Sequence, residues 1–255
     1  MAEALILGII QGITEYLPVS STAHLILFTW FFRIGGIMDT LSFDVALHLG
    51  TLIAVVLYFR RDWIAMLKTN RKLFVLLMVA TIPAGLAGYL LNDFAESNLR
   101  NPLIISVALI IVSFIMWWSE KFRKSRDIDR LTVSDAIFIG IAQIFALIPG
   151  VSRSGITISA GLARNLGRES ATRFSFLLST PIIAGATTLH LMKIFKTGSD
   201  HNMMVILVGV LSSAVAGLFA IRFLMNFFKK HSLHIFVYYR ILLGLVIMTT
   251  LWLRA

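Results

Sequence analysis

Two short polar segments in a very apolar chain could bind a phosphate group and act on it. In the first, QGITEYLPVSSTAH (11–24), Gln11 and Glu15 are four residues apart, so they share one face of a helix. Hydroxyl side chains and a histidine follow Pro18: Ser20, Ser21, Thr22 and His24. If these residues begin a new helix, its N-terminal end would attract an anion.

The second segment, PGVSRSG (149–155), supplies a positive charge. Arg153 is flanked by Ser152 and Ser154, and Gly150 and Gly155 let the backbone approach a ligand closely. A planar guanidinium beside hydroxyl groups suits phosphate oxygens. The two segments together predict an anion site.

Chemistry at this site is plausible as well as binding. Glu15, helped by Gln11, could hold a divalent ion against a diphosphate, a serine could attack phosphorus, His24 could shuttle a proton, and Arg153 could stabilise transition-state charge. The residues alone leave a second class open, a secondary transporter or lipid flippase that holds the same anion at the midplane without breaking a bond. Ser20 and Thr22 could instead only cap a helix.

The composition indicates a membrane protein. Of 255 residues, 58% are hydrophobic and 14% are charged, and the mean hydropathy is +0.85. The net charge of +10 does not indicate nucleic acid, because Lys and Arg lie in short loops between apolar runs. The N-terminal residues lack the basic start of a signal peptide, so we expect them to be retained. Without cysteine there is no disulfide and no thiol nucleophile.

Six segments are long enough to cross a bilayer as helices: about 40–59, 72–91, 102–118, 174–192, 203–226 and 233–253. The two polar segments instead join apolar runs that are each too short to cross. Half-length helices joined by a polar turn that contains proline are typical of a re-entrant hairpin.

The two hairpins also resemble each other. GIIQGITEYLPVSS (8–21) aligns with GIAQIFALIPGVSR (140–153). We therefore predict an all-α polytopic integral membrane protein with one membrane domain (1–255) built from two inverted-topology repeats, each with one re-entrant hairpin and three transmembrane helices. Repeat 1 covers about 1–118, a cytoplasmic connector about 119–130, and repeat 2 about 131–255.

The charge distribution predicts the orientation. Four loops on one side hold 15 Lys and Arg residues, against five on the other side, so the first side is expected to be cytoplasmic. Other ionisable residues in or near apolar segments are assigned to packing or segment edges: Asp44, His48, Asp135 and His190. Arg240 is expected to pair internally.

The motifs resemble those of a known family. QGITEYLPVSSTAH and PGVSRSG, together with SFDVALHLGTLIAVVLYFRRD, SFLLSTPIIAGAT and YRILLG, are similar to segments of the undecaprenyl pyrophosphate phosphatases of the bacitracin-resistance type, over nearly the whole chain. The resemblance implies a hydrolase of the bacterial inner membrane that removes the terminal phosphate of undecaprenyl diphosphate. Its product is the carrier lipid of cell-wall assembly.

The resemblance also implies roles for individual residues. Glu15 would be the essential carboxylate, Ser21 the nucleophile, His24 the proton-transfer residue and Arg153 the phosphate-binding cation. Other phosphate contacts are expected from Ser20, Thr22, Gly150, Ser152 and Ser154. A divalent cation, Mg2+ or Ca2+, would be held by Glu15 and by Gln11, which stands where some members have glutamate. The site would face the periplasm, and the expected partners are the lipid substrate, the bilayer and a second copy of the chain in a homodimer.

Overall fold

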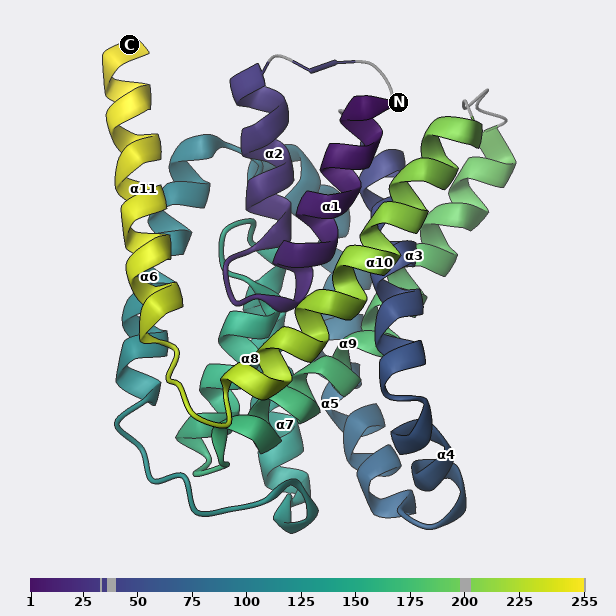
Figure 1. Cartoon of the computed structure of the whole chain (residues 1–255), viewed down its shortest axis with the longest axis vertical. Helices are drawn as coiled ribbons and strands as arrows, with labels where there is room; N and C mark the ends of the chain where they lie inside the picture. The colour runs from purple at the N-terminus through teal and green to yellow at the C-terminus, as the bar shows by residue number, and fades with distance from the viewer. Residues whose placement is uncertain (33, 36–39, 198–202, 255) are drawn as a thin grey trace.

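The computed structural model describes residues 1–32, 34–35, 40–197 and 203–254, and its regular elements in these ranges are all helices (Figure 1). The α-helices are α1 (Ala2–Tyr16), α2 (Ser21–Phe32), α3 (Leu41–Tyr58), α4 (Arg60–Lys68), α5 (Arg71–Asn98), α6 (Pro102–Ser119), α7 (Val133–Ile144), α8 (Arg153–Ala163), α9 (Arg168–Thr197), α10 (Met203–Phe227) and α11 (His234–Arg254). Two short 3₁₀ helices, η2 (Ile128–Arg130) and η3 (Phe145–Leu147), complete them. The all-α prediction is confirmed.

Several helices are long and apolar enough to cross a membrane. Four qualify among the described residues, namely α6, α10, most of α5 and most of α11, and α3 with α4 makes a fifth if the bent pair is one span. Large apolar side chains such as Leu90, Phe219 and Leu242 point outward from these helices, where a bilayer would cover them. The chain is therefore a multi-pass membrane protein. α9, which contains the predicted span 174–192, is not among these helices.

The helix bounds differ from the prediction in two places. α5 and α9 extend beyond the predicted spans 72–91 and 174–192, and each contains a proline, Pro83 and Pro181. Proline is tolerated inside membrane helices because neighbouring groups satisfy the freed backbone. The segment after Tyr58 was expected to be a loop, but it forms α4, which bends away from α3 by 64° and buries Met66.

Two helix hairpins reach the middle of the molecule from opposite ends (Figure 1). The α1–α2 hairpin comes from the end where the chain begins, and the hairpin of α7, η3 and α8 comes from the other end. α1 packs against α10, and α7 packs against α5. These contacts are close because they are made at glycines. A Cβ atom on Gly8 would lie 2.6 Å from the Gly209 carbonyl oxygen, and one on Gly140 would lie 2.4 Å from that of Ala80.

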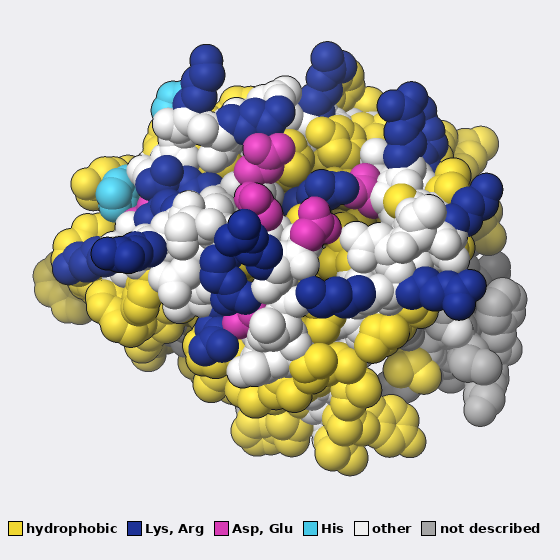
Figure 2. Space-filling view, turned by 90° about the horizontal axis from the view of Figure 1, so that it is seen from below, with side chains coloured by type: hydrophobic (Ala, Val, Ile, Leu, Met, Phe, Trp, Pro, Cys, Tyr) yellow, Lys and Arg dark blue, Asp and Glu magenta, His cyan; other side chains and the backbone are white. Residues whose placement is uncertain are grey.

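The end of the molecule opposite the chain termini is strongly basic. Lys and Arg side chains gather on this face, with a few acidic side chains among them (Figure 2).

A buried acid, Asp135, joins several chain segments at this end of the molecule. Asp135 accepts from Arg126 and Arg164 at 2.6 Å each, and it completes a capping box with Thr132 at the start of α7. The prediction that Asp135 has a structural role at a segment edge agrees with these contacts. The side chain of His190 lies outside the described residues.

Candidate functional site

The first polar segment forms the turn between α1 and α2. α1 ends at Tyr16, and Ser20 adopts a left-handed backbone conformation with φ of 74°. The Ser20 hydroxyl accepts from the backbone N–H of Ala23 at 3.4 Å, so Ser20 caps α2, and Ser21 is its first residue. The N-terminal end of α2, with its positive partial charge, therefore points into the middle of the molecule.

The second polar segment forms an equivalent turn before α8. Ser152 has φ of 70° and its hydroxyl accepts from the N–H of Gly155 at 3.2 Å, so Ser152 caps α8 as Ser20 caps α2. Gly150 has φ of 97°, and a Cβ atom there would lie 2.5 Å from the Ile105 carbonyl oxygen. Only glycine can meet both requirements without strain.

The two turns are in direct contact. The N–H of Gly150 donates to the Ser20 hydroxyl at 3.1 Å, and the Ser154 hydroxyl donates to the Leu17 carbonyl at 3.1 Å. Two residues predicted to contact phosphate, Gly150 and Ser154, are thus used to join the turns, and neither lines the pocket described below. The turns are held in one position without help from a ligand.

Arg240 of α11 fastens both turns from behind. It is fully buried, and its guanidinium donates to the carbonyls of Pro18 at 3.2 Å, Gly150 at 2.8 Å and Val151 at 3.2 Å. A fourth contact, from Arg240 Nε to the Ser113 hydroxyl at 3.3 Å, fixes it to α6. Arg240 was expected to pair inside the protein, and its partners are mainly backbone carbonyl groups. Arg240 is a positioning residue for the turns.

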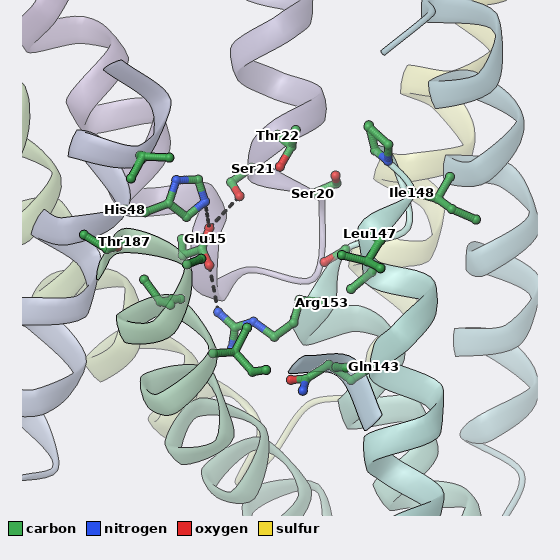
Figure 3. Close-up of a pocket in the computed structure, with 18 residues that line it drawn as sticks. Glu15, Ser20, Ser21, Thr22, His48, Gln143, Leu147, Ile148, Arg153 and Thr187 are labelled. Carbon is green, nitrogen blue, oxygen red and sulfur yellow. Dashed lines mark hydrogen bonds and ion pairs between the residues drawn. The ribbon is translucent and has the colours of Figure 1, made fainter. Parts of the chain in front are cut away.

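Glu15 is the centre of the site (Figure 3). Its Oε1 accepts from Arg153 Nη2 at 2.8 Å, which joins the last turn of α1 to the first residue of α8. Its Oε2 accepts from the Ser21 hydroxyl at 2.6 Å and from Gln11 Nε2 at 3.0 Å. The structure therefore brings together a carboxylate, a hydroxyl and a guanidinium that are up to 138 residues apart in sequence.

These groups lie in the wall of a pocket between the hairpins and helices α3, α5 and α9. Six of the predicted site residues line it: Glu15, Ser20, Ser21, Thr22, Ser152 and Arg153. The rest of the wall is mostly apolar, with Val45, Ala84 and Ile183 among its members. Such a pocket can bind a small charged group in largely apolar surroundings.

His24 lies away from this pocket. Its Nδ1 is 2.7 Å from the Ser20 carbonyl oxygen, its Nε2 is 2.7 Å from the Tyr239 hydroxyl, and its ring stacks on that of Tyr239. Both ring nitrogens are thus engaged in holding the turn against α11. The role of His24 in proton transfer stays a prediction, and the geometry gives it no direct contact with the pocket.

His48 of α3 is the residue that sequence reasoning missed. It was assigned to packing, but it lines the pocket, and its Nε2 lies 3.4 Å from Glu15 Oε2 (Figure 3). An ionisable residue inside a predicted span is a functional candidate by default, so the sequence did mark His48 as a candidate. The sequence could not place His48 beside Glu15, because no neighbouring motif connects the two residues.

The donor set can hold a hard divalent cation only together with substrate oxygens. No group of three or more His, Asp or Glu side chains suited to a metal occurs in the described part of the chain. Glu15 is paired with Arg153, but Gln11 Oε1 is buried and has no hydrogen-bond partner. One carboxylate and one amide oxygen suit Mg2+ bound partly by phosphate oxygens, which is a common arrangement for this ion.

The fold and the site define a class: a multi-pass membrane protein in which two helix hairpins form a pocket with an ion-paired carboxylate, a hydroxyl and a guanidinium. Comparison with known proteins gives the family. The model of the family described as bacitracin resistance protein BacA matches residues 4–246, and the chain belongs to this family.

Two relatives illustrate the similarity. An undecaprenyl-diphosphatase from Thermodesulfovibrio yellowstonii is 52% identical over 245 residues, which cover 96% of this chain and 95% of that protein. An undecaprenyl-diphosphatase from Moorella thermoacetica is 45% identical over 261 residues, which cover 99% of this chain and 98% of that protein. The similarity therefore extends over nearly the whole length of both relatives.

Proposed function

We propose that this protein hydrolyses undecaprenyl diphosphate to undecaprenyl phosphate and inorganic phosphate, which recycles the carrier lipid of cell-wall assembly. The observation that carries the proposal is the Glu15–Arg153 ion pair with the Ser21 hydroxyl beside it, in a chain 52% identical to an undecaprenyl-diphosphatase. A pocket with apolar walls and one charged centre suits a diphosphate on a long apolar tail.

Arg153 and the capped helix ends would hold the terminal phosphate. In the bonds to Glu15 and to the Ser175 carbonyl, Arg153 uses two of its five N–H donors, so three are left for phosphate oxygens. The N-terminal ends of α2 and α8 add positive partial charge from two directions. Thr22 and Ser152 are placed to contribute hydroxyl contacts from the pocket wall.

Ser21 would act as the nucleophile and Glu15 as its base. The Ser21 oxygen forms a bond to the terminal phosphorus while its proton passes to Glu15 Oε2, which it already contacts at 2.6 Å. The bond from phosphorus to the bridging oxygen breaks, and its electron pair leaves with the lipid monophosphate. Glu15 passes the proton to the departing lipid phosphate. Water then attacks the phosphoserine and gives a proton to Glu15, the bond from phosphorus to the Ser21 oxygen breaks, and Glu15 returns the proton to that oxygen.

We further propose that a divalent cation, Mg2+ or Ca2+, assists binding. Glu15 and Gln11 would hold it together with diphosphate oxygens. When bound, such an ion neutralises phosphate charge as a Lewis acid.

We infer that the chain forms one membrane domain of two inverted repeats with re-entrant hairpins. Matched positions of the two halves support this proposal. Ser20 and Ser152 are both left-handed caps, and Gly8 and Gly140 both pack closely on the long helix of the other half. The pairing of α1 with α10 and of α7 with α5 is what a pseudo-twofold relation would produce.

We also propose that the protein lies in the bacterial inner membrane, with the site open to the periplasm. The basic face in Figure 2 would be cytoplasmic, since Lys and Arg concentrate on that side of membrane proteins. The chain termini would then lie on the periplasmic side. The bilayer is a partner in this arrangement, and the homodimer remains a prediction from the sequence.

The function is tested with protein purified in detergent. Release of inorganic phosphate from undecaprenyl diphosphate is measured with and without a divalent cation. We expect release by the wild type, stimulation by the cation, and losses of at least about 10²-fold in Glu15→Gln and Arg153→Ala. Matched controls are Glu169→Gln and Arg123→Ala on the exposed basic face, which should keep full activity.

The same experiment separates the enzyme from the alternative class. A transporter or flippase would bind the lipid diphosphate in the same pocket, and Arg153→Ala would weaken that binding. Binding of the diphosphate without any phosphate release by the wild type would contradict the proposed hydrolase.

A further inference from the structure

We propose that Gln143 of α7 recognises the terminal phosphate of the substrate, through a carboxamide that donates one hydrogen bond to a phosphate oxygen and accepts another from a P–OH group. This inference deepens the proposed function and rests on it. It gives a role to a polar side chain of the pocket wall that the proposed reaction does not use.

The packing of α7 places Gln143 in the pocket wall. Gln143 lies in the last turn of α7 and lines the same pocket as Glu15 and Arg153. In the view of Figure 3 its amide end extends from α7 toward the pocket, with the Arg153 side chain between it and Glu15. One turn earlier, a Cβ atom on Gly140 would lie 2.4 Å from the Ala80 carbonyl oxygen of α5. The backbone that carries Gln143 is therefore held tightly against α5.

The Gln143 side chain is buried and has no hydrogen bond within the described part of the protein. The residue is 2% exposed, and neither its Oε1 nor its Nε2 has a partner among the described residues. Buried polar groups in folded proteins are nearly always paired, so each exception needs an explanation. A ligand in the pocket supplies one for Gln143.

The first half of the chain shows the partner that Gln143 lacks. Gln11 matches Gln143 in the alignment of the two hairpins, and its Nε2 donates to Glu15, four residues later, at 3.0 Å. The position that matches Glu15 in the second hairpin is Leu147, which also lines the pocket. A leucine side chain cannot accept a hydrogen bond, so the amide of Gln143 stays available for a ligand.

The two available atoms of the carboxamide define the group that they can bind. Nε2 carries two N–H donors and Oε1 is an acceptor, so the complementary group must offer both an acceptor and a donor. A terminal phosphate with one proton offers both, as P–O⁻ oxygens and a P–OH group. The inner phosphate of the lipid diphosphate has no P–OH group when it is ionised, and neither has a terminal phosphate that carries a further substituent. Gln143 therefore favours a free terminal phosphate.

Arg153 and Gln143 then recognise different properties of the same phosphate. Arg153 supplies positive charge, which attracts any anion of this size, whereas the neutral amide distinguishes anions by their hydrogen-bond donors. Sulfate resembles phosphate in shape but has no S–OH group at neutral pH, so Oε1 would face an oxygen that can only accept. The two residues together predict a preference for phosphate over sulfate.

The test measures how strongly inorganic phosphate and sulfate inhibit the wild type and Gln143→Met, a variant of similar side-chain volume. Hydrolysis is followed through the undecaprenyl phosphate formed. We expect a wild-type inhibition constant for phosphate at least about 10-fold below that for sulfate. Gln143→Met should raise the constant for phosphate about 10- to 100-fold, close to that for sulfate.

The kinetics with the lipid substrate should change in the same direction. KM of Gln143→Met should rise about 10- to 100-fold, and kcat should stay within about threefold, because the amide contacts the terminal phosphate in the ground state as well as in the transition state. Gln143→Leu, a second apolar variant, should give the same changes.

Thermal unfolding in detergent separates this role from a structural one. Without phosphate, Gln143→Met should have the Tm of the wild type or a higher one, because it loses no hydrogen bond within the protein. Added phosphate should raise the Tm of the wild type more than that of the variant.

Ser159→Ala is the matched control. The Ser159 hydroxyl is also buried and has no partner among the described residues, but it lines another, apolar groove between α6, α7 and α8. The preference for phosphate and the KM should therefore stay as in the wild type.

Two results would overturn the inference while the proposed function stands: an unchanged preference for phosphate over sulfate in both apolar variants, or a Tm of both variants clearly below that of the wild type. Failure of the wild type to form undecaprenyl phosphate would instead contradict the proposed function. The rise in Tm with phosphate would still report whether Gln143 binds the anion.

Discussion

At the scale of single residues, the site depends on how one carboxylate is shared. Glu15 contacts a cation on one oxygen and a hydroxyl on the other, and it is almost fully buried. Burial of an isolated carboxylate would be very unfavourable, so Arg153 is needed to stabilise it. The same contacts orient Ser21, whose hydroxyl donates to Glu15 and therefore turns an oxygen lone pair toward the pocket.

A first prediction concerns this hydroxyl. Ser21→Ala should lower phosphate release by at least about 10²-fold, because the attacking oxygen is absent. The wild type, quenched during turnover, should carry one phosphoryl group on Ser21, detectable by mass spectrometry of the digested protein. Ser125→Ala, which removes an exposed hydroxyl in the connection between α6 and α7, should retain the phosphoserine. Full activity in Ser21→Ala would contradict the covalent step.

The sequence alone predicts that Glu15, Ser21 and Arg153 belong to one site, because they lie in two matching motifs. Glu15 and Ser21 lie six residues apart in one motif, and Arg153 lies in the matching motif, so local spacing and the internal repeat connect them. His48 and Arg240 come from other helices, and their contacts depend on how those helices pack. The direction of the His24 side chain, toward Tyr239 of α11, could not be deduced for the same reason.

At the scale of elements, the fold is held by the ends of helices as much as by their faces. Glu120, just after α6, accepts from Arg168 at 2.7 Å and from the backbone N–H of Leu233 at 2.9 Å. It thereby joins α6 to the start of α9 and to the connection before α11. Such long-range contacts were not predictable from hydropathy, which locates spans but does not report which ends meet.

A second prediction follows for Glu120. Burial alone would raise its pKa, but hydrogen bonds from Arg168 and the Leu233 N–H outweigh burial, so the pKa lies below its usual value. The stabilisation is therefore complete above the unfolded pKa of about 4.3 and is lost as the pH falls through the lower folded value.

Glu120→Gln should consequently unfold more easily than the wild type at pH 7, by about 1–3 kcal/mol. The difference in Tm should shrink as the pH is lowered below about 4. Thermal unfolding in detergent measures both. Glu169→Gln is the control, since its contact with Lys229 at 4.0 Å is exposed, and it should change stability by less than about 1 kcal/mol. A difference for Glu120→Gln that grows in acid would contradict the assignment.

At the scale of the whole molecule, the two hairpins must enter from opposite ends for their turns to meet. The direct contact of Gly150 with Ser20, and the clamp of Arg240 on both turns, require this arrangement. The site is then formed by both halves of the chain, and neither half alone contains both Glu15 and Arg153. An apolar belt and one basic end complete the features expected of a protein with a fixed orientation in a bilayer.

The orientation gives the last prediction, and the absence of cysteine from the chain makes it simple to test. Ser97→Cys, near the end of α5, and Lys68→Cys, at the end of α4, place one exposed thiol at each end of the molecule. With the basic face cytoplasmic, a membrane-impermeant thiol reagent should label Ser97→Cys in cells with a permeable outer envelope, and Lys68→Cys only after the inner membrane is opened. Retained phosphatase activity verifies that both variants are folded, and the unlabelled cysteine-free parent is the blank. Labelling of Lys68→Cys in cells with an intact inner membrane would contradict the proposed orientation.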